Sequence, residues 1–291
     1  MKVLCLGVAL CVVCLPVAAA VAAIYGWDGG GANNLWTTAG NWRGDVVPPP
    51  TQNQDIDIRA SYLVSPFQTT ANWSYATSGT YASISVRANA TYGMVLQKTG
   101  TGTLNAGALL FVGYDSTRKA ALDADQSLTG TSLTAQNAVA LDVASGATVD
   151  INGSFSVDAI NGASLCEKFG AGSLTPDTLY CKSGDTAGEH VTFLISDGNV
   201  TVSSATDPLT SIEAANTVDA DATLTFDGTG ATYDPGTLLL LGGDANPSMP
   251  GGEALFDFDA GTLTDPDGVK MYGLSRIDTE QSFVTDTFLV G

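Results

Sequence analysis

The chain has 291 residues, of which 44% are hydrophobic and 14% are charged, a mixture too apolar for a disordered polymer and too poor in charge for a helical protein. We therefore expect one packed domain, and the excess of 25 Asp over 5 Glu favours strands and turns within it. The formal net charge is −19, and from residue 186 onward 17 acidic side chains face only Lys270 and Arg276. Such a surface repels phosphate backbones and anionic lipid head groups, so nucleic acid is excluded as the expected partner.

The first 22 residues are predicted to be a signal peptide. Lys2 precedes a continuous apolar stretch over residues 3–16, and the small residues of Ala-Val-Ala at 20–22 fit a signal peptidase site. We expect the mature chain to begin near Ala23, to be secreted or displayed at the cell surface, and to have no membrane span once the signal is removed. The alternatives are an uncleaved membrane anchor and, despite the bulky valines before it, a lipoprotein site at Cys14.

Beyond the signal, no stretch of a dozen residues has the apolar period of a helix. Short runs instead alternate apolar residues with Thr, Ser or Asp, which is typical of strands joined by tight turns. In ATVDING (147–153) and ATLTFDG (222–228), the final Asn-Gly or Asp-Gly is expected to supply the positive φ of a reversal or corner. The predicted strands cover residues 55–60, 82–88, 93–98, 139–143, 147–153, 155–160, 191–204, 222–228, 237–243, 254–261 and 282–290.

Regular short strands fit either a β-sandwich or a solenoid, in which each coil adds one strand to long parallel sheets. The runs are rich in small and aliphatic residues and only 8% of the chain is aromatic, which favours the narrow interior of a solenoid. All four tryptophans lie in the first quarter of the chain, as expected of an element that covers the first coil (Trp27, Trp36, Trp42 and Trp73). We predict an all-β parallel β-helix with an N-terminal cap over residues 23–60 and a solenoid without a strict period over residues 61–291.

Three of the five cysteines belong to the predicted signal, which leaves Cys166 and Cys181 in the mature chain. Two cysteines in an exported protein predict one disulfide. The segment between them carries two glycines and a proline and is interpreted as an excursion loop, which a disulfide would stabilise by about 3 kcal/mol. The alternative is a pair of buried free thiols.

Two parts of the chain resemble a known family. Residues 27–42 (WDGGGANNLWTTAGNW) and the following residues 44–58 look like the opening of mature bacterial exported proteins with autotransporter-associated β-strand repeats, many of which carry a PEP-CTERM sorting tail. The string LQKTGTGTL (96–104) is similar to the repeat of that family, in which Lys-x-Gly-x-Gly-Thr-Leu leads into a strand. The resemblance implies a right-handed parallel β-helix that is displayed or released, with no assigned catalytic residues. The last residues before Gly291 lack the sorting tail, so surface attachment is expected to depend on a partner.

Few residues offer catalytic chemistry. The only histidine, His190, would have to serve any Ser-His-Asp triad, but no G-x-S-x-G elbow accompanies it, and we interpret it as a solvent-facing loop residue. Zinc-binding patterns are missing from the mature sequence. The strings Gly-Thr-Gly at 100–102 and 228–230 lack the spacing of a phosphate-binding loop and are predicted to be turns.

Asp257 and Asp259 alternate on a predicted strand, which places both carboxylates on one face, roughly 6.5–7 Å apart along the backbone. Such a pair could serve a glycosidase, and a β-helix lyase would also need a basic residue. Outward Asp residues also keep a solenoid soluble, however, and we favour this second interpretation. With Asp265 and Asp267 the pair could form a calcium site, although the spacing of a calcium loop is not met.

We therefore expect an exported, non-enzymatic structural or adhesive protein with no cofactor, whose partner is a surface component or a polysaccharide. The alternative is a polysaccharide-binding or polysaccharide-degrading β-helix. A concave groove with convergent carboxylates and a basic residue would favour the enzyme, whereas a flat face studded with Asp would favour the structural role.

Overall fold

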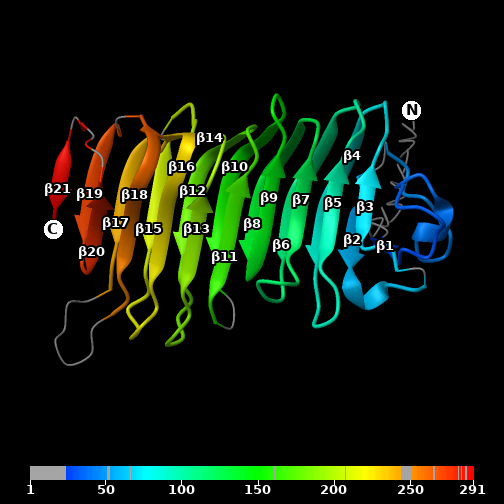
Figure 1. Ribbon diagram of the computed structural model, residues 1–291, viewed down its shortest axis with the longest axis horizontal. Coiled ribbons are helices and arrows are strands. Elements are labelled where there is room, and N and C mark those ends of the chain that lie inside the picture. The colour runs from blue at the N-terminus through cyan, green and yellow to red at the C-terminus, as the bar shows by residue number, and fades with distance from the viewer. Residues whose placement is uncertain are drawn as a thin grey trace, which may run out of the picture.

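The computed structural model describes residues 24–50, 53–65, 67–159, 162–206, 208–243, 251–264, 266–280, 282, 284–285 and 287–291. The predicted signal peptide lies outside these residues. The described chain forms a 21-stranded sheet that winds from one end of the molecule to the other as a parallel β-helix (Figure 1). Every pairing between named strands is parallel, so the predicted solenoid is confirmed and the alternative β-sandwich is wrong.

Each coil has three faces, and each face is a ladder of strands along the axis. Face 1 contains β1 (Ile24–Trp27), β2 (Asp55–Arg59), the C-terminal halves of β4 (Gly79–Arg87), β6 (Leu104–Val112), β8 (Leu128–Gln136), β10 (Thr148–Asp158) and β12 (Ser173–Lys182), and then β15 (Leu209–Glu213), β17 (Thr237–Leu241), β19 (Gly268–Tyr272) and β21 (Phe288–Val290). Face 2 contains β3 (Thr70–Trp73), β5 (Met94–Lys98), β7 (Ala120–Ala124), β9 (Ala138–Val143), β11 (Ser164–Phe169), β13 (Val191–Ile195), the first halves of β16 (Ala222–Asp234) and β18 (Ala254–Leu263), and β20 (Ser275–Thr279). Face 3 is narrow and contains the N-terminal halves of β4, β6, β8, β10 and β12, then β14 (Asn199–Thr201) and the ends of β16 and β18.

Helical structure is confined to two short 3₁₀ turns, Ala39–Asn41 and Ala60–Tyr62, within the described ranges. In the same part of the chain, no helix has the length and apolar character needed to cross a membrane.

The interior consists of columns of apolar side chains, because alternate residues of every strand point inward and parallel neighbours keep their register. One column on face 1 continues through six coils, and each of its side chains is at most 1% exposed (Ile56, Ile84, Leu109, Leu133, Phe155 and Leu179). Full burial of such a side chain contributes about 1.5–3 kcal/mol, so the stacked columns supply most of the driving force for folding.

Coil length varies although strand register does not. Hydrogen-bonded residues in adjacent coils are 24 positions apart at Asn105 and Thr129, but 32 positions apart at Asp221 and Glu253. The additional residues lie in the turns between faces, where loop length has little energetic cost. A strict numerical period is therefore not needed, which agrees with its absence from the sequence.

The Asn-Gly and Asp-Gly pairs mark corners inside long strands rather than turns that end them. Gly153 lies at a register shift within β10, where the strand passes from face 3 to face 1, and Gly228 lies within β16. Neither glycine has a positive φ, so that part of the prediction is wrong. A Cβ at Gly153 would collide with the carbonyl oxygen of Thr131 in the preceding coil, so the glycine is needed for close stacking.

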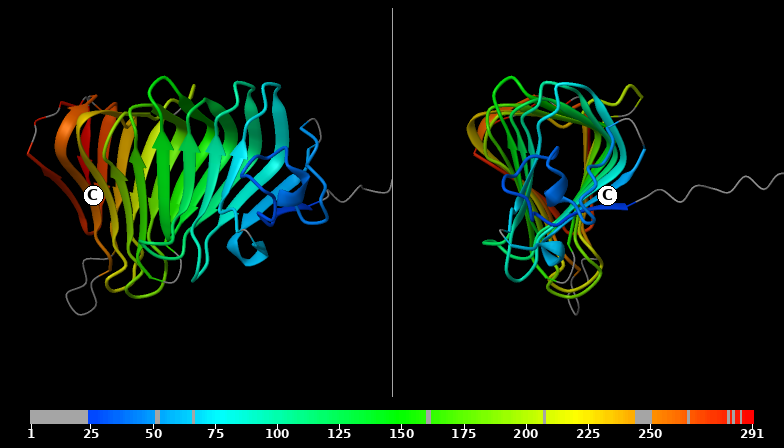
Figure 2. Two further views of the ribbon diagram at one scale, coloured as in Figure 1. Left: turned by 45° about the vertical axis from the view of Figure 1, so that its right-hand side comes forward. Right: turned by 90° about the vertical axis from the view of Figure 1, so that its right-hand side faces the viewer.

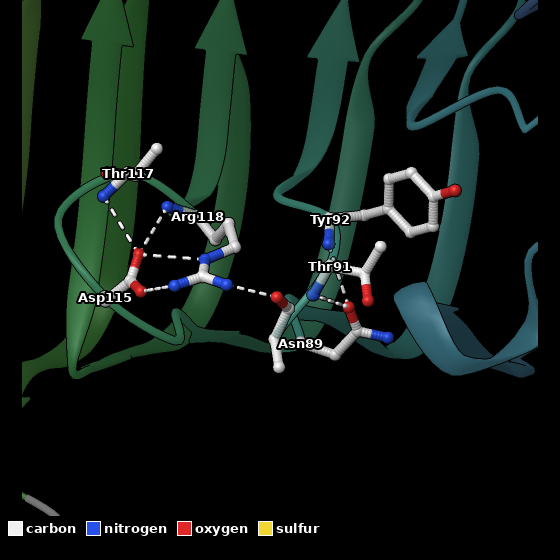
Figure 3. A network of polar contacts seen from close by, with 7 residues as sticks. Asn89, Thr91, Tyr92, Asp115, Thr117 and Arg118 are labelled. Carbon is white, nitrogen blue, oxygen red and sulfur yellow. Dashed lines mark hydrogen bonds and ion pairs between the residues drawn. The ribbon is translucent and has the colours of Figure 1, made fainter.

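The turns between face 1 and face 2 also stack on one another (Figure 3). The side chain of Asn89 accepts hydrogen bonds from the backbone N–H groups two and three residues later, and Asp115 does the same in the next coil. Arg118 bonds to Asp115 and reaches back to the carbonyl oxygen of Ala90. The two side-chain-capped turns are thereby joined across the coils.

The tryptophans close the N-terminal end of the tube, where the blue segment lies across the opening in the end-on view (Figure 2). Trp42 packs edge-on against both Trp27 and Trp36, with ring centroids 5.2 and 4.8 Å away, and all three rings are at most 1% exposed. Leu35 forms a parallel bridge with Asn72 of β3, so the cap also covers the first strand of face 2. The predicted Trp-rich cap is confirmed, but Trp73 lies on β3, and β1 and β2, which fall within the predicted cap, belong to face 1.

The C-terminal end has a different surface. Among the described residues no further strand covers β20 or β21, and Phe288, Leu289 and Val290 are 56%, 46% and 68% exposed. The two ends of the rod therefore differ, because tryptophans cover the first coil and exposed apolar residues mark the last.

The predicted disulfide is not formed. Cys166 and Cys181 are free and fully buried, and the Cys181 thiol donates to the carbonyl oxygen of Thr223 at 3.2 Å. The segment between them is not an excursion loop, because it forms most of β11 and β12 and both sulfurs occupy inward positions of the coil. Burial raises the pKa of Cys181 to about 12 and holds the pKa of Cys166 well above its usual value, so both thiols stay protonated and unreactive.

The burial of the two thiols gives a first testable prediction. In the folded protein, neither cysteine should react with a maleimide at pH 7, because the thiolate is disfavoured and no reagent reaches the core. After unfolding in guanidinium without reductant, mature protein should show two reactive thiols per chain by mass spectrometry. Recovery of no reactive thiol until a reductant is added would show that a disulfide forms after all.

Candidate functional site

His190 lies in the turn that precedes β13, and its Nδ1 atom is 3.3 Å from Oδ2 of Asp221. The two side chains are 43% and 41% exposed. Within the described part of the chain, the ring forms no hydrogen bond with a serine or a cysteine. The pair is an exposed contact between neighbouring turns, which matches the loop position expected from the sequence.

The acidic residues singled out in the sequence are only partly brought together. Asp257 lies on β18 opposite Asp278 of β20. Partial burial and then the nearby charges of Asp259, Asp278 and Asp227 raise the pKa of Asp257. Asp267 lies in the turn before β19, where its N–H donates to Gly236, and Asp265 is outside the described residues. Where residues are described, no group of three or more His, Cys, Asp or Glu side chains could hold a metal ion.

The two basic residues of this half do not complete a catalytic groove. Arg276 is already paired with Glu253 at 3.2 Å and with Asp278 at 2.9 Å. The hollow beside Arg276 is lined by Glu253 and by residues 273–275, and Asp257 does not contribute to it. Lys270 lies on face 1, away from the face 2 strands that carry Asp257 and Arg276. The charged groups are therefore spread over outward strand surfaces.

A Lys-x-Gly-x-Gly motif occurs twice and builds the corner between face 2 and face 3. The first copy, KTGTGTL, covers residues 98–104, and the second, KFGAGSL, covers residues 168–174. In both copies the glycines pass over the backbone of the preceding coil, where a Cβ would collide with a carbonyl oxygen. The sequence interpretation recognised the first copy, and the second could have been found from the literal recurrence of Lys-x-Gly-x-Gly.

Both lysines of this motif are completely buried and point into the corner. The Lys168 ammonium donates to the carbonyl oxygens of Gly170 at 2.6 Å, Gly172 at 2.8 Å and Asp197 at 2.7 Å. Lys98 donates to the carbonyl oxygen of Gly100, and its Nζ lies 4.8 Å from the ring centroid of Trp73. Burial lowers the pKa of both groups, that of Lys168 to about 8. The lysines satisfy turn carbonyls that would otherwise be buried without a donor.

A third group of charged residues lies near the N-terminal end, on the outward surface of β1, β2 and β4. Asp57 accepts two bonds from Arg59, at 3.1 and 2.5 Å, and one from the hydroxyl of Tyr62 at 3.2 Å. The guanidinium of Arg43 lies 4.5 Å from the Tyr62 ring centroid, and that of Arg59 lies 4.9 Å from it. Gly26 lies beneath them and leaves room for this packing, because a Cβ there would displace the Arg43 side chain and contact Tyr62 closely.

Arg87 extends this group onto β4, because it pairs in register with Arg59. Its Nε atom donates to Ser85 at 2.8 Å. We call Arg43, Arg59, Tyr62 and Arg87 the arginine patch. Two hollows adjoin it, one between Arg43 and Tyr62 and the other beside Arg59 and Arg87, and Ile24 lines both. The sequence analysis missed the patch, because its members come from separate segments and no local motif unites them.

Comparison with known proteins adds no family to this picture. No protein family matches the chain, and no curated protein or solved structure is significantly similar to it.

Asp257 gives a prediction about charge repulsion. Because partial burial and then the neighbouring carboxylates raise its pKa in the folded state, the ionised side chain destabilises the fold, so Asp257→Asn should increase the free energy of unfolding at pH 7 by up to about 0.5 kcal/mol. The gain should shrink as salt is added. Thermal melts at low and high salt measure it, with Asp185→Asn in an exposed turn as the control. A loss of stability in Asp257→Asn would contradict the repulsion.

Lys168 gives a prediction about pH. Its pKa is about 8 in the folded protein against 10.5 for an unperturbed lysine, so between these values the unfolded chain holds a proton that the folded chain has released. The stability of the wild type therefore rises with pH in this window. The measured quantity is the free energy of unfolding of the wild type minus that of Lys168→Met, and it should increase by about 3 kcal/mol between pH 7 and pH 11.

Urea unfolding of both proteins across this pH range gives the difference, which removes the contributions that tyrosines and thiols make to both. The control is Lys182→Met, because the Lys182 side chain is 43% exposed and ion-paired with Glu213. A difference for Lys168→Met that is independent of pH would show that the buried amine is not held as the structure indicates.

Proposed function

We propose that the protein is an exported, non-enzymatic β-solenoid with a structural or adhesive role at the cell surface or outside the cell. The observation that carries this proposal is the unbroken parallel stacking of the coils, which arranges outward side chains in columns along a stiff rod. Such a surface suits an extended partner, a surface component or a polysaccharide, because equivalent contacts can recur from coil to coil. The signal-like pattern at residues 1–22 supports export.

Polar contacts between coils support the stiffness of this surface. Gln97 donates to Asp123 at 2.9 Å, and Thr175 donates to Asp150 at 2.9 Å, each across one coil boundary. These side chains face outward and are held in place by their neighbours, so little conformational entropy remains to be lost when a partner binds.

An enzymatic role on polysaccharide is the alternative, and the arrangement of charge supports it less well. A glycosidase or lyase needs carboxylates and a proton donor that converge on one bond. Asp257 and Asp259 lie on one strand, and the nearest arginine described, Arg276, already pairs with two carboxylates. The outward surface of face 2 is better suited to contact than to bond cleavage.

The test starts from the full chain expressed in a bacterial host. Exported protein should begin near Ala23 by N-terminal sequencing, and beads coated with it should adhere to a polysaccharide matrix without releasing reducing ends. An intact Met1 in the membrane fraction would contradict export, and beads that fail to adhere to any matrix would contradict adhesion. Release of reducing ends that disappears in Asp257→Asn would favour the enzyme instead.

A further inference from the structure

Arg43 and Arg87 are cations without a carboxylate partner on a strongly acidic protein. Arg43 stacks on Tyr62 and Arg87 donates to Ser85, and neither forms an ion pair within the residues that the structure describes. The neighbouring Asp57 does not neutralise them, because Arg59 and Tyr62 already bond to both of its carboxylate oxygens. The remaining donors of the two guanidinium groups are thus free for an external anion.

The wider distribution of charge singles out this part of the rod. Residues 24–119 contain six basic and five acidic side chains, whereas residues 120–291 contain four basic and 25 acidic ones. An anionic ligand is therefore repelled along most of the solenoid and much less near its N-terminal end, where residues 24–92 contain three arginines and four aspartates. A polymer as densely charged as nucleic acid would still meet the overall charge of −19. The charge distribution of the protein therefore favours an anionic ligand whose negative charges are widely spaced.

The surface between the arginines has the features of a sugar-binding floor. Gly26, Ser83 and Ser85 point outward here, and their small size leaves two hollows that meet at Ile24. Asp55 also lines the second hollow, where it accepts a hydrogen bond from the Ser83 hydroxyl at 2.6 Å. Ser85 accepts one from Arg87. The remaining oxygen lone pairs can accept hydrogen bonds from sugar hydroxyls, and Ile24, which is 69% exposed, offers an apolar surface for the face of a sugar ring.

We infer that the arginine patch binds a carboxylated polysaccharide, with Arg43 and Arg87 each recognising a carboxylate and the small residues between them accommodating the sugar chain. This inference rests on the proposed function, since it names the ligand class of an exported adhesive protein. Arg59 acts as a positioning residue, because it holds Asp57 and supports the ring of Tyr62.

The experiment measures binding of the full, exported chain to polygalacturonate, with dextran as the neutral polymer and dextran sulfate as the densely charged one. Affinity electrophoresis compares wild type with Arg43→Gln, Arg87→Gln and the control Arg276→Gln. The control removes the same charge from a residue already paired in the acidic half. Thermal melts confirm that each variant is folded.

Wild type should bind polygalacturonate, and each patch variant should bind it about tenfold more weakly, whereas Arg276→Gln should bind as wild type does. Affinity should fall as salt is added. Binding to dextran sulfate alone, equal binding by all variants, or no binding to polygalacturonate would overturn the inference. If protein-coated beads adhere to a matrix but the Arg43 and Arg87 variants adhere equally well, only the inference about the arginine patch is wrong. If the chain binds polygalacturonate but is never exported, only the proposed function is wrong.

Discussion

Close contact between the backbones of successive coils is the constraint on which this structure depends. Parallel strands lie about 4.8 Å apart, so wherever the chain changes face it must pass directly over the turn of the preceding coil. At such places glycine is required because any side chain would enter the neighbouring backbone. A Cβ at Gly102 would collide with the carbonyl oxygen of Thr77 in the preceding coil, and one at Gly113 with that of Ala138 in the following coil. The number of residues in each turn can otherwise vary, which explains why the solenoid has no strict sequence repeat.

The same stacking determines where charge can be placed. Outward carboxylates in register approach one another, as at Asp257 and Asp278. Burial and the neighbouring negative charges then disfavour the ionised form of Asp257 and raise its pKa. Inside the corners, buried turn carbonyl oxygens need a positively charged or neutral hydrogen-bond donor. Lys168 supplies three hydrogen bonds there at the cost of a lowered pKa. Near the N-terminus, arginines from three segments meet on one surface.

The sequence contains many of the strands and the tryptophan cap as local patterns, so these could be predicted from it, whereas the predicted ranges leave out β6, β8 and β12 among others. The run at residues 93–98 alternates apolar and polar positions and forms β5, which ends at Lys98. The state of Cys166 and Cys181 could not be predicted in the same way, because export favours a disulfide whereas inward placement on β11 and β12 depends on register. The arginine patch depends on the pairing of distant strands, which composition does not reveal.

The asymmetry of the two ends has a mechanical consequence. The hydrogen bonds between successive coils run along the axis of the rod, so a stretching force acts directly on them. The coil held by the fewest packing contacts is expected to separate first. The first coil is held by packed indole rings, whereas Phe288 and Val290 of the last strand remain largely exposed. Within the described residues, a stretching force would therefore separate β21 from β19 before it opened the tryptophan-covered first coil, so the arginine-bearing end would stay folded longer.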